Sequence, residues 1–177
     1  VYIKPSADGE RIYFTNAGLL TRNPGGSGNG AAQRTDRLID GKFENIACTS
    51  KVITNPCQVV EDPDDLSRYY LGSYNSGYSS IKDKALEGSL KANLPTDVVN
   101  TGFTNGFDFD KEGNMWIYPM SGKKTAVISM LPAAKRKSGV TNVVSDDWNT
   151  LATFTNLEVN FDQHVFICKK SNMILFA

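Results

Sequence analysis

Apolar residues along the chain recur in short runs separated by polar turns, and the clearest example lies near the middle. Phe107 and Phe109 are two residues apart with an aspartate between them, which is the alternation of a β-strand. Asp110 and Gly113 then suit the first and last positions of a type I turn. A second apolar and aromatic run follows at residues 115–118. The stretch therefore predicts a β-hairpin closed by a short turn.

The same arrangement of two apolar runs around a polar turn occurs four times. The expected hairpins are 2–3 with 12–14, 59–60 with 69–71, 107–109 with 115–118, and 157–159 with 165–167. Their second runs begin at residues 12, 69, 115 and 165, so they recur at intervals of 57, 46 and 50 residues. Repeats of about 40–50 residues with several strands each are typical of β-propeller blades. The sequence therefore predicts an all-β fold, a β-propeller with about four blades; the alternative is a β-sandwich whose hairpins resemble one another by chance.

The repeat also predicts how the chain is divided. We expect a single β-propeller domain or half-propeller fragment over residues 1–177, with approximate blades at 1–50, 51–100 and 101–153 and an incomplete blade at 154–177. Propellers have about 4–8 blades, so part of a larger propeller is expected. Both chain ends are apolar and strand-like, which favours a piece of a longer chain or a processed product. An open half-propeller would expose strand edges, so we expect self-association or further chain that completes it.

Charge and hydropathy narrow the class of partner. The chain has 19 basic and 19 acidic residues and no net charge. A surface that binds nucleic acid or an anionic membrane carries a basic excess, so no nucleic-acid partner is expected. No apolar run approaches the roughly 18–20 residues that cross a bilayer, so we expect no direct membrane insertion by this segment.

Three polar tracts are better interpreted as loops or turns than as binding motifs. The glycine-rich segment 23–30 lacks the lysine and the following helix of a phosphate-binding loop, so a mobile surface loop is the better interpretation. The acidic segment 61–65 lacks the spacing of a calcium loop and is interpreted as a solvated turn. The basic run 135–137 is interpreted as a soluble loop tip. Residues 84–90 alone show some helical preference.

The three cysteines leave their pairing open. An odd number leaves at least one thiol free unless it bonds to another chain. Cys48 and Cys57 are near enough in sequence for a disulfide across a hairpin, but three buried thiols are favoured because free cysteine is commonly buried. Cys168 lies in an apolar run and is expected in a core strand.

Signals for catalysis are weak. His164 is the single histidine, it falls in an expected turn, and no nucleophile motif accompanies it. A metal site built on histidine would have this one ligand. A carboxylate pair such as Asp108 and Asp110 remains an alternative, although the turn already accounts for Asp110. We therefore expect no enzymatic activity, no metal and no cofactor.

Two stretches resemble known propeller families. The residues from Asp108 to Ile117, with Asp110, Gly113-Asn114 and Trp116, resemble the D-x-x-G-N-L-W-I blade signature of two-component-regulator propeller repeats. Residues 60–81 are similar to the propeller of a type IX secretion-system surface component and its relatives. Trp148 resembles the tryptophan that opens the outer strand of such blades. The sequence departs from the pattern at residues 118–120, where glycines are expected, and at 163–164, where Gly-Asn is expected.

The resemblance implies a non-enzymatic module outside the cytoplasm, in the periplasm or at the cell surface of a Gram-negative bacterium. Members of the first family are similar to ligand-binding sensor ectodomains, which makes such a sensor the first expectation. The alternatives are a surface scaffold or binding component of a secretion or envelope machine, and a propeller enzyme such as a lyase or glycosidase.

A regular strand order predicts where a ligand would bind. The loops before the first strand and after the second strand of the third blade would lie on one face. The residues expected there are Phe103, Thr104 and Asn105 from the first loop, and Ser121 and Lys123 from the second. We expect them to bind a glycan, a peptide or a protein.

Overall fold

The computed structural model describes residues 2–6, 9–17, 33–48, 56–73, 77–83, 85–90, 93–98, 103–121, 124–158 and 164–177. These residues form β-strands with little helix, so the expectation of an all-β fold is confirmed. Helical structure within them includes α1 (Ala133–Lys137) and the short 3-10 turns Thr96–Val98, Val140–Asn142 and Ser145–Asp147.

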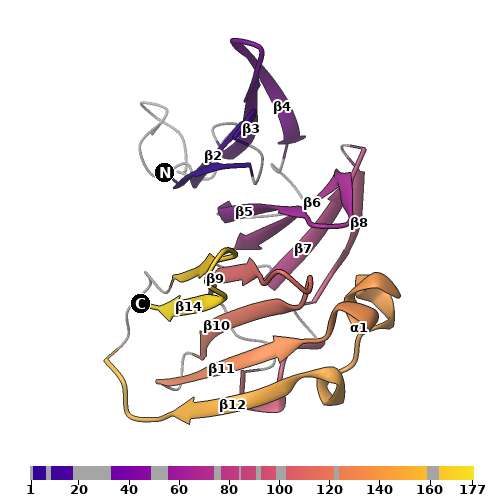
Figure 1. The fold of residues 1–177 in the computed structure, drawn as a ribbon. Coiled ribbons are helices and arrows are strands. Elements are labelled where there is room, and N and C mark those ends of the chain that lie inside the picture. The colour runs from indigo at the N-terminus through magenta and orange to yellow at the C-terminus, as the bar shows by residue number, and fades with distance from the viewer. Residues whose placement is uncertain are drawn as a thin grey trace, which may run out of the picture.

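The strands follow one another in four groups, which we call units 1 to 4 (Figure 1). Unit 1 contains β1 (Tyr2–Pro5), β2 (Ile12–Ala17), β3 (Gln33–Ile39) and β4 (Lys42–Cys48). Unit 2 contains β5 (Pro56–Asp62), β6 (Asp65–Ser73), β7 (Gly77–Lys82) and β8 (Ala85–Ser89). Unit 3 contains β9 (Phe103–Phe109), β10 (Met115–Ser121), β11 (Thr125–Leu131) and β12 (Asn149–Phe154). Unit 4 is the hairpin of β13 (Val165–Cys168) and β14 (Met173–Phe176).

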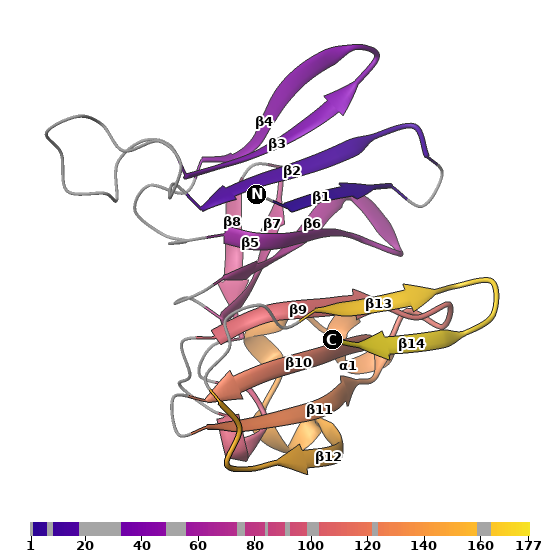
Figure 2. The same ribbon diagram turned by 90° about the vertical axis from the view of Figure 1, so that its left-hand side faces the viewer.

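Units 1, 2 and 3 are antiparallel meanders in which each strand pairs with the next along the chain. A bridge between Ser73 and Thr104 joins units 2 and 3 into one eight-stranded sheet. The first strands lie beside one another: β5 contacts β1 and β9, and β9 contacts β13. Figure 2 shows β1, β9 and β13 running in the same direction on the side that faces the viewer.

The core lies between neighbouring units, because unit 2 packs apolar side chains on both of its faces. Tyr69 and Tyr70 are adjacent on β6 and therefore point to opposite faces of unit 2. The Tyr69 ring lies 6.4 Å from that of Tyr13 in unit 1, and the Tyr70 ring lies 5.2 Å from that of Phe109 in unit 3. Each fully buried side chain of this size contributes about 1.5–3 kcal/mol of hydrophobic stabilisation. The two tyrosines thus connect the cores on either side of unit 2.

Side-chain hydrogen bonds also join units 2 and 3. The buried Gln58 amide donates to the carbonyl of Phe107 and accepts from its N–H at 3.4 Å, so it bridges β5 and β9 as a neighbouring strand would. The Tyr78 hydroxyl donates to the carbonyl of Gly106 at 3.0 Å. These bonds satisfy polar groups that would otherwise be buried without a partner.

The turn of unit 3 explains its sequence signature. The Asp110 carboxylate accepts hydrogen bonds from the backbone N–H groups of Glu112 and Asn114, from the Asn114 amide and from the Trp116 indole, at 2.8 to 3.1 Å. Gly113 has φ +81°, a conformation that costs side-chain-bearing residues about 1–2 kcal/mol. Asn114 also accepts from the N–H of Ala133 at 2.9 Å, at the start of α1. The Asp, Gly, Asn and Trp of the signature therefore build one turn.

Three sequence-based expectations are wrong. The fourth hairpin pairs residues 165–168 with 173–176, so Leu157 lies outside it and the turn is at 169–172. Residues 85–89 form strand β8 where some helical preference was expected, since pairing with β7 outweighs local propensity. Cys168 is exposed at the end of β13 with a free thiol, whereas a buried position in a core strand was expected. The side chains of Cys48 and Cys57 and the segment 23–30 lie outside the described residues.

Candidate functional site

The first strands of all four units surround one pocket of about 260 Å³, which we call the first-strand pocket. Its lining combines apolar side chains with charged ones. The lining residues are Lys4, Pro5, Ser6, Tyr13, Val59, Val60, Glu61, Asp108, Ile167 and Lys169. Concave sites with an apolar lining and a few polar groups are the usual form of a ligand site.

Lys4 and Asp108 meet across this pocket. The Lys4 Nζ lies 2.7 Å from Asp108 Oδ1, and the two side chains are 23% and 7% exposed. Asp108 also accepts from the N–H groups of Phe109 at 2.9 Å and Ile167 at 3.3 Å, so β1 and β13 are both held to β9. Burial lowers the pKa of Lys4, the attraction of Asp108 opposes that shift, and the nearby Lys169 adds to it. Lys4 is therefore already paired with a carboxylate, and Lys169 adds a second positive charge to the lining of the pocket.

Glu61 also lines the pocket. Its Oε1 accepts from Arg11 Nε at 2.7 Å and from the Tyr13 hydroxyl. The Arg11 and Glu61 side chains are 11% and 8% exposed, so this is a largely buried charge pair. Burial, supported by the hydrogen bond to Glu61, raises the pKa of Tyr13 well above its usual value. The pocket is thus lined by two lysines and two carboxylates, and the Glu61 carboxylate is fixed by Arg11 and Tyr13.

The residues expected to bind a ligand lie at the other end of the strands. Phe103, Thr104 and Asn105 begin β9, while Asp108 is near its end, about 16 Å from Phe103 at the usual rise per residue. Phe103 is opposite Met120, so the start of β9 and the end of β10 at Ser121 are adjacent, as expected. The side chains of 103–105 and 121 and all of Lys123 are outside the described part of the chain. Their role in binding stays a prediction.

A repeated charge pattern in the sequence marks the pocket, although no single hairpin reveals it. A charged residue lies at the C-terminal end of every first strand or just beyond it: Lys4 in β1, Glu61 in β5, Asp108 in β9 and Lys169 after β13. Equivalent ends of adjacent first strands meet, so charges repeated at this position gather in one place. Asp108 and Asp110, the alternative carboxylate pair, each have their own partners.

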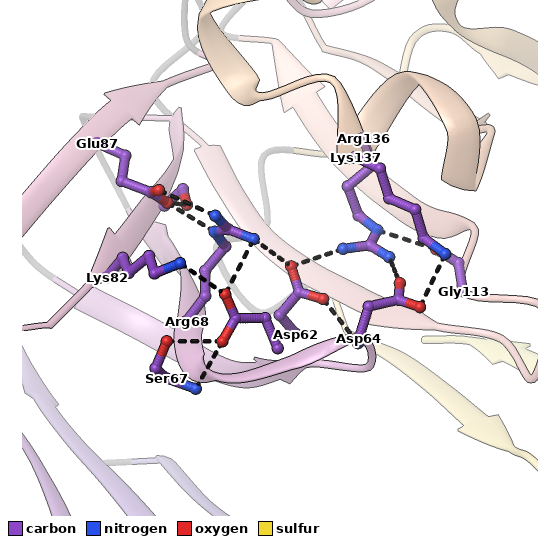
Figure 3. A network of polar contacts seen from close by, with 11 residues as sticks. Asp62, Asp64, Ser67, Arg68, Lys82, Glu87, Gly113, Arg136 and Lys137 are labelled. Carbon is purple, nitrogen blue, oxygen red and sulfur yellow. Dashed lines mark hydrogen bonds and ion pairs between the residues drawn. The ribbon is translucent and has the colours of Figure 1, made fainter.

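A second group of charged side chains lies at the β5–β6 turn (Figure 3). Arg136 of α1 is 2% exposed and donates from Nη1 to Asp62 at 2.6 Å, from Nη2 to Asp64, and from Nε to the carbonyl of Gly113 at 3.0 Å. Its guanidinium lies 5.2 Å from the centre of the Phe109 ring. The interpretation of this basic run as a soluble loop tip is therefore wrong for Arg136.

The solvated-turn interpretation of 61–65 is likewise wrong for Asp62, whose side chain is inaccessible. Arg68 extends the network outward, with Nε 2.8 Å from Glu87 and Nη1 3.5 Å from Asp62. The charges in this group satisfy one another, and together they tie α1 of unit 3 to the turn of unit 2. This group is therefore a structural tie between units 2 and 3.

The described residues offer neither a metal cluster nor a membrane-spanning helix. No three or more His, Cys, Asp or Glu side chains are grouped there in a way that could hold a metal ion. The helices among these residues are too short and too polar to cross a membrane.

Comparison with known proteins identifies a shared fold. No family model matches the chain, and no curated protein matches it. A solved structure with a similar fold is PorZ, described as an essential bacterial surface component of the type-IX secretion system of Porphyromonas gingivalis. The identity is 16% and the TM-score 0.60, and the match covers 94% of this chain. It covers 21% of that chain, so the likeness extends over about a fifth of PorZ.

Proposed function

We propose that this chain is part of a β-propeller that acts outside the cytoplasm, at the surface of a Gram-negative bacterium, as a binding component of a secretion or envelope machine. The observation that carries the proposal is the structural likeness to PorZ over 94% of the chain. The order of the strands supports the propeller. Units 1 to 3 are meanders in chain order with their first strands side by side, as blades are arranged around an axis.

The role in binding rests on the first-strand pocket. Propeller blades surround a central channel, and the four first strands meet at the pocket lined by Lys4, Glu61, Asp108 and Ile167. The mixture of lysine donors, carboxylates and apolar lining suits a polar ligand with an anionic group, such as an acidic glycan or a peptide carboxylate. We propose binding without catalysis, because the charged groups are engaged in ion pairs with one another.

Surface exposure and secretion test the cellular part of the proposal. An antibody against this chain should label intact cells, and deletion of the gene should stop the export of secreted proteins. Labelling that appears only in ruptured cells, or export that continues without the gene, would overturn it.

Ligand arrays test the binding part. Glycan and peptide arrays probed with the purified chain should show a ligand that is lost in Lys169→Ala and retained in Asn105→Ala and Lys123→Ala. Lys169 is exposed, so its replacement leaves the fold intact. The reverse pattern would move the site to the ends of β9 and β10, and unchanged binding in all three variants would remove both sites.

A sensor ectodomain is the second candidate, and the turn built by Asp110 and Trp116 favours it because it matches the signature of the regulator repeats. The complete reading frame separates the two candidates. A membrane helix followed by a kinase would support sensing, whereas a C-terminal sorting domain would support the scaffold.

A further inference from the structure

The charges at the first-strand pocket form two closed pairs and leave one positive charge over. Lys4 is paired with Asp108 at 2.7 Å, and Glu61 is paired with Arg11 at 2.7 Å. Each pair sums to zero, so the charge of Lys169 is the excess at this pocket. Among the described residues the exposed Lys169 ammonium has no ion-pair or hydrogen-bond partner. One further negative charge would therefore be balanced there.

The other polar groups of the lining are occupied within the chain. Ser6 Oγ accepts from the N–H of Arg11 at 3.0 Å, and the Tyr13 hydroxyl donates to Glu61. Asp108 also accepts from two backbone N–H groups. A ligand rich in hydroxyl groups would need a new partner for each of them, and a buried hydroxyl without one costs about 1–3 kcal/mol. The lining therefore favours a ligand whose buried part is apolar.

The rest of the lining can receive such an apolar group. Pro5 comes from β1, Val59 and Val60 from β5, and Ile167 from β13. Val59 and Val60 are 0% and 6% exposed and are packed in the cores on the two faces of unit 2, so this part of the lining is held in place. Removal of apolar surface from water contributes about 25 cal/mol per Å². An aliphatic group should therefore bind here more tightly than a polar group of the same size.

The volume of the pocket limits what can enter. At about 260 Å³ it is below the usual range of about 300–1,000 Å³ for small-molecule sites, so it suits one end group of a longer ligand. The last residue of a peptide carries a carboxylate and a side chain on the same carbon, and capture of a C-terminal carboxylate is a recurring mode of peptide recognition. An acidic sugar carries its carboxylate on a ring whose other substituents are hydroxyl groups, which this lining does not match.

We propose that the first-strand pocket binds the C-terminal residue of a peptide or protein, with its carboxylate at Lys169 and an aliphatic side chain against Val59, Val60 and Ile167. The inference rests on the proposed binding function and narrows the ligand from an anionic group in general to this chemical class. Burial lowers the pKa of Lys4, and repulsion from Lys169 adds to that shift. A carboxylate bound at Lys169 offsets the repulsion, so binding also stabilises the pair of Lys4 and Asp108.

A peptide titration followed by amide correlation NMR tests the site. The probes are acetylated glycyl-glycyl-leucine with a free C-terminal carboxylate, the same peptide as its C-terminal amide, and acetylated glycyl-glycyl-serine with a free carboxylate. The leucine acid should shift the backbone amides of Val60, Asp108 and Ile167. It should also bind about tenfold more tightly than either of the other two probes.

Two neighbouring lysines provide the variant and its matched control. Lys169→Ala should abolish the preference for the acid over the amide, and Lys170→Ala should keep it, because Lys170 is also exposed but does not line the pocket. Lys169→Arg should retain most of the preference, since it keeps the charge, and circular dichroism confirms that the variants fold. Equal affinity for the acid and the amide, or a loss in Lys170→Ala as large as in Lys169→Ala, would overturn the proposal.

Glucuronic acid as a fourth probe separates this inference from the proposed function. If glucuronate shifts the same amides and the leucine acid does not, the inference is wrong and the pocket still serves as a binding site. No shift with any of the four probes would also overturn the inference. A ligand that is found on the arrays and lost in Lys169→Ala would leave the proposed function standing in either case.

Discussion

Arg136 and Asp62 are separated by 74 residues in the sequence, and their side chains meet at 2.6 Å between Nη1 and Oδ2. The two side chains are 1% and 0% exposed. Arg136 belongs to the short helix after β11, and Asp62 ends β5. The pair therefore holds unit 3 against the turn of unit 2. Because both charges are buried, their attraction offsets the cost of desolvation only while this geometry is kept.

Arg136→Met should lower the free energy of unfolding by about 3–5 kcal/mol, because Asp62 would remain as a buried charge without its main partner. Urea denaturation followed by tryptophan fluorescence measures the change. Lys137→Met is the control: its Nζ lies 2.8 Å from Asp64 but its side chain is 51% exposed, so the cost should stay below about 1 kcal/mol. If Arg136→Met in an Asp62→Asn background costs as much as in the unmodified chain, the two residues are not coupled as described.

Asp110→Ala should destabilise the turn of unit 3 by about 2–3 kcal/mol, since the carboxylate accepts four hydrogen bonds and the indole of Trp116 would lose its acceptor. Glu112→Ala in the same turn serves as the control because Glu112 is exposed. Urea denaturation measures the change in stability, and the wavelength of the tryptophan emission maximum reports the environment of the indole. Equal stability of both variants would show that Asp110 does not organise the turn.

The hairpin of unit 3 could be predicted because its determinants are local. Strand alternation, Asp110 and Gly113 all lie within one short stretch, and the observed register joins the expected residues. The hairpin of unit 4 is less predictable, because neither the expected turn at 162–163 nor the observed turn at 169–172 contains a glycine. The observed turn instead uses Asn172 at φ 54°, a conformation that asparagine tolerates better than most residues.

The site was less predictable because its contacts cross units. Nothing near Arg136 in the sequence distinguishes it from its two exposed lysine neighbours. Its buried partner, Asp62, lies 74 residues away along the chain. The pairing of Lys4 with Asp108 likewise depends on which first strands become neighbours. Sequence patterns predict which residues form strands, whereas the order of the units in space decides which charges meet.

Alkaline pH should destabilise the fold through its buried tyrosines. Burial raises the pKa of Tyr70 to about 12 and also raises those of Tyr69 and Tyr78. The unfolded chain loses these protons near pH 10 whereas the folded chain retains them, so the folded state binds more protons and stability falls as pH rises above about 10. Tyr70→Phe should remove about 2–3 kcal/mol of that fall between pH 10 and 12. Denaturation at stepped pH with tyrosinate absorbance checks this, and a stability that is level across the window would contradict it.

Acid should weaken the network at the β5–β6 turn. The hydrogen bond from Arg68 lowers the pKa of Glu87, and the hydrogen bond from Lys137 lowers that of Asp64. Carboxyls of the unfolded chain take up protons first as pH falls below about 4.5, so the unfolded state binds more protons and stability is lost on the acid side of that value. Arg68→Met should make this loss shallower, by less than about 1 kcal/mol because the pair is partly exposed. Lys111→Met is the matched control, since Lys111 and Glu112 are 3.6 Å apart and more than half exposed. Parallel acid titrations of the two variants by circular dichroism decide the matter: identical acid slopes would mean that the ion pair of Arg68 and Glu87 does not contribute to stability.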